Sequence, residues 1–176
     1  DQHIGGMPTD GVTVIAARPG HGKTVLATQI AVNFAREDRP TALLTLEMSR
    51  AAMSLRIAAG LARVPMSSIV QGKERIDEDQ VERLHRVAHD VESWPLLIDD
   101  TFDQGIGALR TAARRCEARY GRPCELVIVD YIQLVKPPRH MAMYRSQEAE
   151  ISWITRESVR IAKDLGCPVI LVAQLN

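Results

Sequence analysis

Residues 16–24 read AARPGHGKT, and this stretch decides the fold. It follows an apolar, β-branched run over Val12–Ala16 and precedes a helical pattern that starts at about Gly22. A strand, a glycine-bearing loop, a Lys-Thr pair and a helix are the layout of a phosphate-binding loop, whose backbone N–H groups and helix dipole face one anion. Lys23 would then reach the β- and γ-phosphates, and the Thr24 hydroxyl would bind Mg²⁺.

One position departs from the usual pattern G-x-x-x-x-G-K-[ST], because Ala17 stands where the first glycine is expected. We expect the strand to turn into the loop at Ala17, where a methyl group is tolerated. Gly20 and Gly22 leave room for the backbone to wrap a phosphate. The alternative is a glycine-rich turn with a chance Lys-Thr pair, and it is disfavoured because strand and helix flank the motif as its mechanism requires.

Length and composition are those of one soluble globular domain: 176 residues, 45% hydrophobic and 25% charged. Lys+Arg and Asp+Glu are 22 each, so no overall basic excess indicates a nucleic-acid surface, although charge can still be concentrated locally. The cysteines at 116, 124 and 167 form no C-x-x-C pair, which favours free thiols in a reducing cytosol. No apolar run approaches the length of about 18 residues of a membrane span. The chain starts at Asp1 rather than Met, so we expect a piece of something longer.

Apolar strands alternate with helical patterns along the chain. The expected strands are residues 12–16, 41–46, 96–98, 126–129 and 169–173. The expected helices are residues 22–36, 49–63, 77–94, 106–120 and 146–165, with a polar connector over 66–75. Ser49 is expected to cap the second helix, and Asp77 with Gln80 the third. We therefore predict an α/β domain with a parallel sheet of five strands, covered by helices on both faces.

Polar residues follow the carboxyl ends of these strands, where open α/β sheets bind ligands. Asp130, after the run LVIV, is interpreted as the acid that positions Mg²⁺. Glu47 could polarise the water that attacks the γ-phosphate, or it could be a surface acid before a helix. Gln174 could hydrogen-bond the γ-phosphate, although such a residue is more often a polar strand terminus. Asp99-Asp100 compete with Asp130 for the metal, and we rank them lower as strand-end and turn residues.

Three further features have simpler explanations. His85 and His89 are spaced i, i+4 as in a zinc motif, but residue 86 is Arg, so a solvated helix face is favoured. Trp94 and Trp153 are expected to pack in the core or at an interface. A basic loop could touch nucleic acid or a neighbouring subunit, or be an ordinary solvated loop. Its residues are Lys136, Arg139, His140 and Arg145.

Five blocks together resemble the ATPase domain of DnaB-type replicative DNA helicases, which belong to the RecA-like P-loop superfamily. They are AARPGHGKT, LTLEMS, IDD, VIVDYIQL and VAQLN. The resemblance extends from about Gly5 to Asn176, and its most specific parts are ARPxxGKT and DYxQL. Recombinases and clock-type ATPases share the other blocks more loosely.

The resemblance implies roles for individual residues. Glu47 matches the catalytic glutamate, Gln174 the γ-phosphate sensor, and Thr24 with Asp130 the Mg²⁺ site. ATP is then expected to contact the loop residues Arg18, Pro19, Gly20, His21, Gly22, Lys23, Thr24 and Val25. The implied strand order is 3-2-4-5-1, which places Asp99-Asp100 on an outer strand, away from the γ-phosphate.

The function implied is Mg²⁺-dependent ATP hydrolysis that drives a cytoplasmic helicase along single-stranded DNA during replication. The family assembles as homo-hexamers, and primase or a loader are possible partners. We find no match in this sequence to three parts of the family: the N-terminal domain, the later DNA-binding loops and the arginine finger. We therefore expect residues 1–176 to be a partial ATPase core. On its own, this core is expected to hydrolyse ATP weakly. The alternatives are a recombination or clock-type ATPase and a non-catalytic nucleotide-binding loader, with a small-molecule kinase less favoured because no lid segment is found.

Overall fold

The computed structural model describes residues 6–71, 76–101, 105–135 and 147–175. The strands are β1 (Val12–Ala17), β2 (Thr41–Thr45), β3 (Leu96–Asp99), β4 (Leu126–Asp130) and β5 (Val169–Gln174). The helices are α1 (Lys23–Arg36), α2 (Arg50–Ala62), α3 (Met66–Gln71), α4 (Glu78–Ser93), α5 (Ala108–Tyr120) and α6 (Gln147–Leu165), with a 3₁₀ turn η1 (Ile132–Leu134). None of the helices described here has the length and apolar content needed to cross a bilayer.

The five strands form one parallel sheet in the order β1-β5-β4-β2-β3. Read from the other edge this is 3-2-4-5-1, so the predicted order is confirmed. The register aligns Thr45 with Asp130, and Ala17 with Gln174. The residues expected at the site therefore end adjacent strands on one edge of the sheet.

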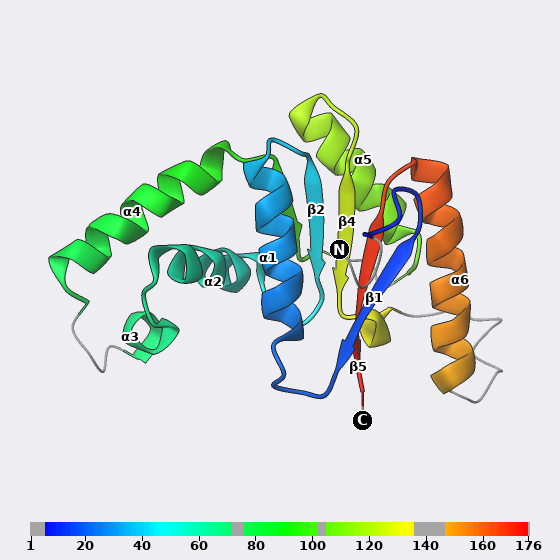
Figure 1. The fold of residues 1–176 in the computed structure, drawn as a ribbon, viewed down its shortest axis with the longest axis horizontal. Coiled ribbons are helices and arrows are strands. Elements are labelled where there is room, and N and C mark those ends of the chain that lie inside the picture. The colour runs from blue at the N-terminus through cyan, green and yellow to red at the C-terminus, as the bar shows by residue number, and fades with distance from the viewer. Residues whose placement is uncertain (1–5, 72–75, 102–104, 136–146, 176) are drawn as a thin grey trace.

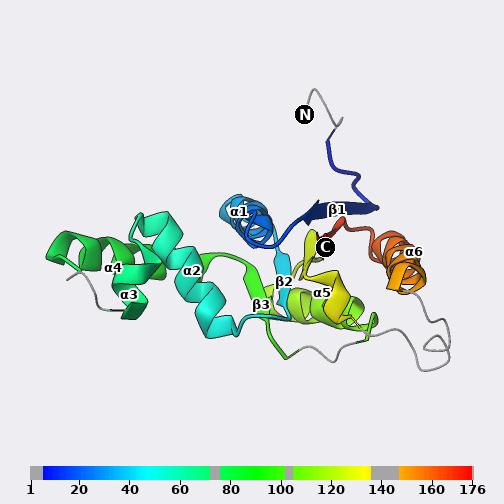
Figure 2. The same cartoon turned by 90° about the horizontal axis from the view of Figure 1, so that it is seen from below.

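Helices cover both faces of the sheet, as the apolar strands require. α1 lies on one face, and α5 and α6 lie on the other (Figures 1 and 2). Every residue of β2 and β4 is buried, because both strands are central and their side chains pack into both layers. One core joins Leu109 of α5 and Ile161 of α6 to the sheet, and the other joins Ala31 of α1 and Met53 of α2 to it.

The start of two helices follows the predicted capping residues. The Ser49 side chain accepts a hydrogen bond from the N–H of Ala52 at 3.2 Å. Asp77 and Gln80 form a complete capping box, in which the N–H of Gln80 donates to Asp77 at 2.7 Å and the N–H of Asp77 donates to Gln80 at 3.2 Å. Each bond satisfies an N–H group that has no partner inside the helix.

Some local predictions were wrong. The connector expected over 66–75 begins with a short helix, α3, and the following residues 72–75 lie outside the described part. No described residue of α4 is buried, and its Val81 is exposed. α4 lies beside α2 and α3 at the far end of the molecule from β1, so it does not cover the sheet (Figure 1). On α1, Val25 and Leu26 are also exposed.

Candidate active site

The loop after β1 turns sharply through two glycines in the left-handed region. Gly20 has φ 76° and Gly22, the N-cap of α1, has φ 78°. A Cβ built on either residue would meet nothing within 4 Å, so the space on this side of the loop is open. Ala17 is the last residue of β1 and pairs with Gln174, which explains why it needs no glycine conformation. The loop thus has the shape of a phosphate cradle.

Hydrogen bonds within the loop hold its basic residues. The Lys23 ammonium donates to the carbonyl oxygen of Arg18 at 3.2 Å. The N–H of His21 donates to the same oxygen at 3.3 Å, and His21 Nδ1 lies 3.0 Å from the carbonyl oxygen of Pro19. The Lys23 ammonium is therefore bound to the loop backbone, and its charge lies at the N-terminus of α1.

A cleft of about 500 Å³ opens beside this loop at the carboxyl edge of the sheet. The predicted site residues that line it are Pro19, Gly20, Gly22, Lys23, Thr24, Val25, Glu47, Asp130 and Gln174. Arg18 and His21, although described, do not line the cleft. Met48, Arg56 and Tyr131 line it and were not predicted. Four separate strand ends thus contribute to one hollow.

Asp130 is the buried acid of the cleft, with only 4% of its surface exposed. Burial raises the pKa of Asp130, and the nearby Glu47 adds to this, whereas a hydrogen bond from Thr24 and the charges of Lys23 and Arg56 oppose it. A buried carboxylate in contact with a hydroxyl is a donor pair that suits a hard divalent cation such as Mg²⁺. The residues present therefore fit the metal expected at Thr24 and Asp130.

Glu47 is placed by the turn that follows β2. The buried Thr45 hydroxyl donates to the carbonyl oxygen of Met48 at 2.9 Å, and the N–H of Met48 lies 3.3 Å from the same hydroxyl. The N–H of Leu46 donates to the carbonyl oxygen of Asp130 at 2.9 Å. This turn holds Glu47 at the rim of the cleft, where its side chain is exposed to solvent.

Gln174 ends β5, and its backbone is held by the side chain of Gln133. The Gln133 amide donates to the carbonyl oxygen of Gln174 at 2.7 Å and accepts from its N–H at 3.2 Å. Gln133 is the glutamine of the DYxQL block and lies on η1. The pair joins this block to the end of β5 in space, and the Gln174 side chain lines the cleft.

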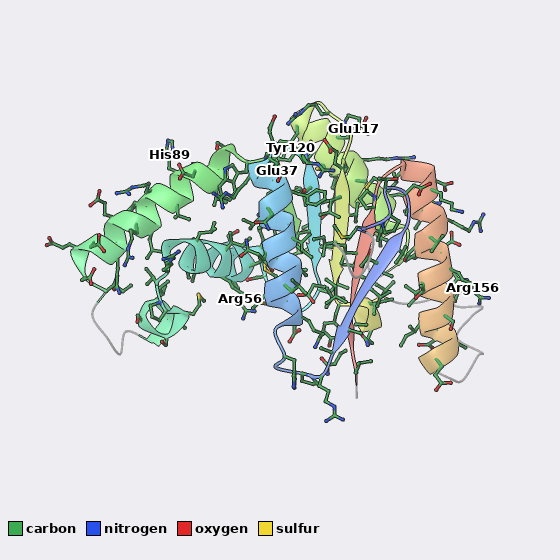
Figure 3. All side chains as sticks on the ribbon, in the orientation of Figure 1. Glu37, Arg56, His89, Glu117, Tyr120 and Arg156 are labelled. Carbon is green, nitrogen blue, oxygen red and sulfur yellow. The ribbon has the colours of Figure 1, made fainter. Side chains whose placement is uncertain are left out.

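Arg56 is the cationic residue that sequence reasoning missed. It lies on α2, which starts shortly after Glu47, and it extends beside α1 (Figure 3). Its charge is close enough to act on the pKa of Asp130. The only signal available in the sequence was that α2 begins at the carboxyl end of β2, so its first turns must lie near the cleft.

Asp99 and Asp100 lie outside the cleft, as their lower rank predicted. The Asp99 carboxylate accepts bonds from the Thr101 hydroxyl at 2.6 Å and from Arg115 at 2.8 Å. Asp100 accepts from the N–H of Arg50 at 2.7 Å, at the start of α2. Both acids therefore organise the end of β3 rather than a metal.

The histidines and tryptophans behave as the simpler explanations predicted. His85 and His89 are exposed on α4, and His89 points away from the molecule (Figure 3). No group of His, Cys, Asp and Glu within the described residues is arranged to hold a metal ion of its own. Trp94 and Trp153 are partly buried against the two cores. The basic loop residues Lys136, Arg139, His140 and Arg145 lie outside the described residues.

Comparison with known proteins agrees with this geometry. The model of the DnaB-like helicase C-terminal domain matches residues 1–176. The chain belongs to this family. Members of the DnaB family that it resembles include the replicative DNA helicase DnaB of Synechocystis sp., 29% identical over 177 residues, and that of Leifsonia xyli subsp. xyli, 30% identical over 177 residues. The alignments cover 100% of this chain but only 20% and 37% of those two proteins.

Two solved structures share the RecA-like fold of this DnaB-like domain. The ATPase domain of G40P superimposes with a TM-score of 0.83 at 25% identity, covering 96% of this chain and 58% of that one. A DnaB-like replicative helicase, described with its interactions with primase, gives a TM-score of 0.85 at 24% identity, covering 97% of this chain and 40% of that one. The five-stranded sheet and its helices therefore have the same RecA-like fold as these two structures.

Proposed function

We propose that the cleft binds Mg²⁺ and ATP and hydrolyses the bond between the β- and γ-phosphates. The observation that carries this proposal is the convergence of Lys23, Glu47, Asp130 and Gln174, from four strand ends, on one cleft beside the phosphate cradle. A phosphate loop alone would indicate only that a nucleotide binds. An acid at the rim and a buried acid at the base add the two functions that hydrolysis needs, which are activation of water and organisation of the metal.

In this proposal each side chain has one task. Lys23 moves from the Arg18 carbonyl to the phosphates, and Thr24 and Asp130 organise Mg²⁺, which when bound neutralises charge developing on the phosphates. Glu47 accepts a proton from the attacking water, and the Gln174 amide hydrogen-bonds the γ-phosphate or that water. Arg56 supplies a further positive charge at the cleft.

We further propose that the intact protein is a replicative helicase that moves along single-stranded DNA as a homo-hexamer. Relatives named replicative DNA helicase DnaB support this proposal. Primase or a loader as partner, and a cytoplasmic location, belong to the same proposal. The resemblance assigns part of each catalytic site to a neighbouring subunit, so an isolated chain should bind ATP and hydrolyse it slowly. DNA-stimulated hydrolysis with strand displacement would distinguish this function from strand exchange by a recombinase.

Substitution of the loop lysine tests the nucleotide site. Lys23→Ala should weaken binding of a fluorescent ATP analogue with Mg²⁺ by about tenfold or more, because a hydrogen bond between charged groups contributes about 1.5–3 kcal/mol. Lys163→Ala, an exposed lysine in the last turn of α6, is the matched control and should bind as the unsubstituted chain does. A folded Lys23→Ala chain with undiminished affinity would refute the site.

A further inference from the structure

The turn that carries Glu47 is neither helix nor strand. It runs from Leu46 to Ser49, after β2 ends at Thr45 and before α2 begins at Arg50. Among the described residues, the Glu47 side chain makes no hydrogen bond or ion pair. The place of its carboxylate therefore depends on how the backbone of the turn is held.

The central strands hold the end of the turn that lies next to β2. The N–H of Leu46 donates to the carbonyl oxygen of Asp130 in β4 at 2.9 Å. The Thr45 hydroxyl donates to the carbonyl oxygen of Met48 at 2.9 Å, and Thr45 is buried. Residues 46–48 are thus bound to β2 and β4.

Asp100 holds the other end of the turn from the outer strand. The N–H of Arg50, the first residue of α2, donates to Asp100 Oδ2 at 2.7 Å. This N–H has no partner inside the helix, and the helix dipole further favours a carboxylate at this end. Asp99, the last residue of β3, pairs with Leu44 of β2, so Asp100 lies where β2 also ends. The contact therefore fixes the start of α2 to the end of β3.

The two acids of the IDD block bind different elements. The Asp99 carboxylate accepts from the Thr101 hydroxyl at 2.6 Å and from Arg115 of α5 at 2.8 Å. Within the described part of the chain, only Asp100 of this pair is hydrogen-bonded to the start of α2. The block therefore combines one contact that fixes α5 with another that fixes the end of the Glu47 turn.

The start of α2 affects two groups of the cleft. Glu47 lies three residues before Arg50, and Arg56, which also lines the cleft, follows on the same helix. A general base must lie within hydrogen-bond reach of the water that it activates, and a misplacement of about 1 Å can cost about 10²-fold in rate. Release of the Arg50 N–H would free the turn on the side that β2 and β4 do not hold.

We propose that Asp100 is a positioning residue for Glu47, which acts by holding the Arg50 N–H and with it the turn that carries the carboxylate. This inference rests on the proposed ATPase function of the cleft. Asp100 does not line the cleft, so it is not expected to touch the nucleotide or Mg²⁺. Its loss should therefore slow hydrolysis and leave nucleotide binding unchanged.

ATP hydrolysis and nucleotide binding by the intact protein test this role together. Asp100 is exposed, so its substitution is expected to leave the fold intact. Asp100→Ala should lower kcat by about tenfold or more, while the affinity for a fluorescent ATP analogue with Mg²⁺ changes by less than about twofold. Asp100→Asn keeps an oxygen that can accept from the Arg50 N–H and should restore most of the rate. Asp99→Ala is the matched control in the same block, and it should lower the free energy of unfolding in urea but keep the normal kcat.

A double variant shows whether Asp100 acts through Glu47. In the Glu47→Gln protein the base is already absent, so adding Asp100→Ala should leave kcat unchanged. A purely structural role would lower kcat in both backgrounds. Hydrogen exchange gives an independent readout, because the Arg50 amide should exchange faster in Asp100→Ala than in Asp99→Ala.

Three outcomes would overturn the positioning role. One is a folded Asp100→Ala protein that hydrolyses ATP at the unsubstituted rate. Another is an Asp100→Asn protein as slow as Asp100→Ala. The third is an equal loss of rate when Asp100→Ala is added to Glu47→Gln. Failure of the proposed ATPase is distinguishable, because the unsubstituted protein would then not hydrolyse ATP, and the inference that rests on that function would fall with it.

Discussion

Gln133 shows at the scale of a single residue how a side chain remote from the reaction can shape the site. Its amide makes both bonds to the backbone of Gln174, across 41 positions of sequence. Each bond contributes about 1 kcal/mol net, but an unpaired buried group would cost more. The pair fixes the end of β5 at the cleft, so Gln133 is a positioning residue for Gln174.

Gln133→Leu should therefore lower kcat for ATP hydrolysis in the intact protein more than it raises KM for ATP. The free energy of unfolding should also fall by about 1–3 kcal/mol, because two backbone groups lose their partner. Steady-state kinetics and urea unfolding measure the two effects. Gln29→Leu, on the exposed surface of α1, is the control and should change stability by no more than about 0.5 kcal/mol. Equal kinetics for Gln133→Leu and the unsubstituted protein would contradict a positioning role.

Asp99 should give the chain a pH-dependent stability. Burial raises the pKa of Asp99, but hydrogen bonds from the Thr101 hydroxyl and N–H, and then from Arg115, outweigh it and hold the pKa below its ordinary value of 3.8. The ionised Asp99 carboxylate therefore stabilises the fold fully above pH 3.8, its ordinary pKa in the unfolded chain. This stabilisation is lost as the pH falls through the lower pKa of the folded state.

Asp99→Asn should accordingly destabilise the chain at neutral pH and have a diminishing effect below pH 3.8. We expect the free energy of unfolding at neutral pH to fall by about 1 kcal/mol. This value is at the low end for a hydrogen bond to a charged group, because solvent screens the half-exposed Arg115. Urea unfolding over a pH series measures this difference in the free energy of unfolding, and Asp90→Asn on the exposed face of α4 is the control. A difference that is constant with pH would contradict the assignment.

Local sequence could predict the residues of the phosphate loop but not all of those around it. The loop is one continuous stretch in which the spacing of Gly22, Lys23 and Thr24 already sets the geometry. Gln133 and Arg56 act through contacts between separate elements. Gln133 belongs to the DYxQL block, but the sequence does not show that its side chain binds the backbone of Gln174. Arg56 is one of several arginines on helices, so no pattern could single it out.

At the scale of elements, α4 illustrates a helix that depends more on its ends than on its core. None of its described residues is buried, yet it has a complete capping box at Asp77 and Gln80. Two exposed pairs, Asp79–Arg83 and Glu82–Arg86, lie at i, i+4 spacing along it. Such surface pairs contribute little, so the cap carries much of the local stability.

Asp77→Ala should reduce the free energy of unfolding by about 1 kcal/mol, because the N–H of Gln80 loses its acceptor. Hydrogen exchange should show the first turn of α4 opening more readily. Asp90→Ala, near the other end of the same helix, is the matched control for removal of an aspartate. Equal exchange in both variants would show that the capping box does not stabilise α4.

The elements also show where periodicity was informative. The strands were predicted to within one residue at each end, because β2 and β4 are buried on both faces and their central residues are continuously apolar. The packing of α4 could not be predicted, because a helical sequence pattern does not say whether a helix packs on the sheet or on another helix. α3 was missed because its short sequence has no cap or long apolar period.

At the scale of the whole molecule, the parallel sheet gathers the candidate site at one edge. The carboxyl edge carries the cleft with Glu47, Asp130 and Gln174. That all strand ends meet at one edge follows from the alternation of strands and helices alone. The order of the strands does not, and it was expected only from the family resemblance.

The measurement that tests the account most directly is ATP hydrolysis by the intact protein with Glu47→Gln. If Glu47 activates the attacking water, kcat should fall by about 10²–10⁴-fold, the usual contribution of a general base, while affinity for Mg²⁺ and ATP stays nearly unchanged. Glu117→Gln, at the opposite end of the molecule from the cleft (Figure 3), should hydrolyse ATP at the normal rate. A folded Glu47→Gln protein that hydrolyses ATP as fast as this control would contradict the central claim that the cleft is an ATPase site built around Glu47.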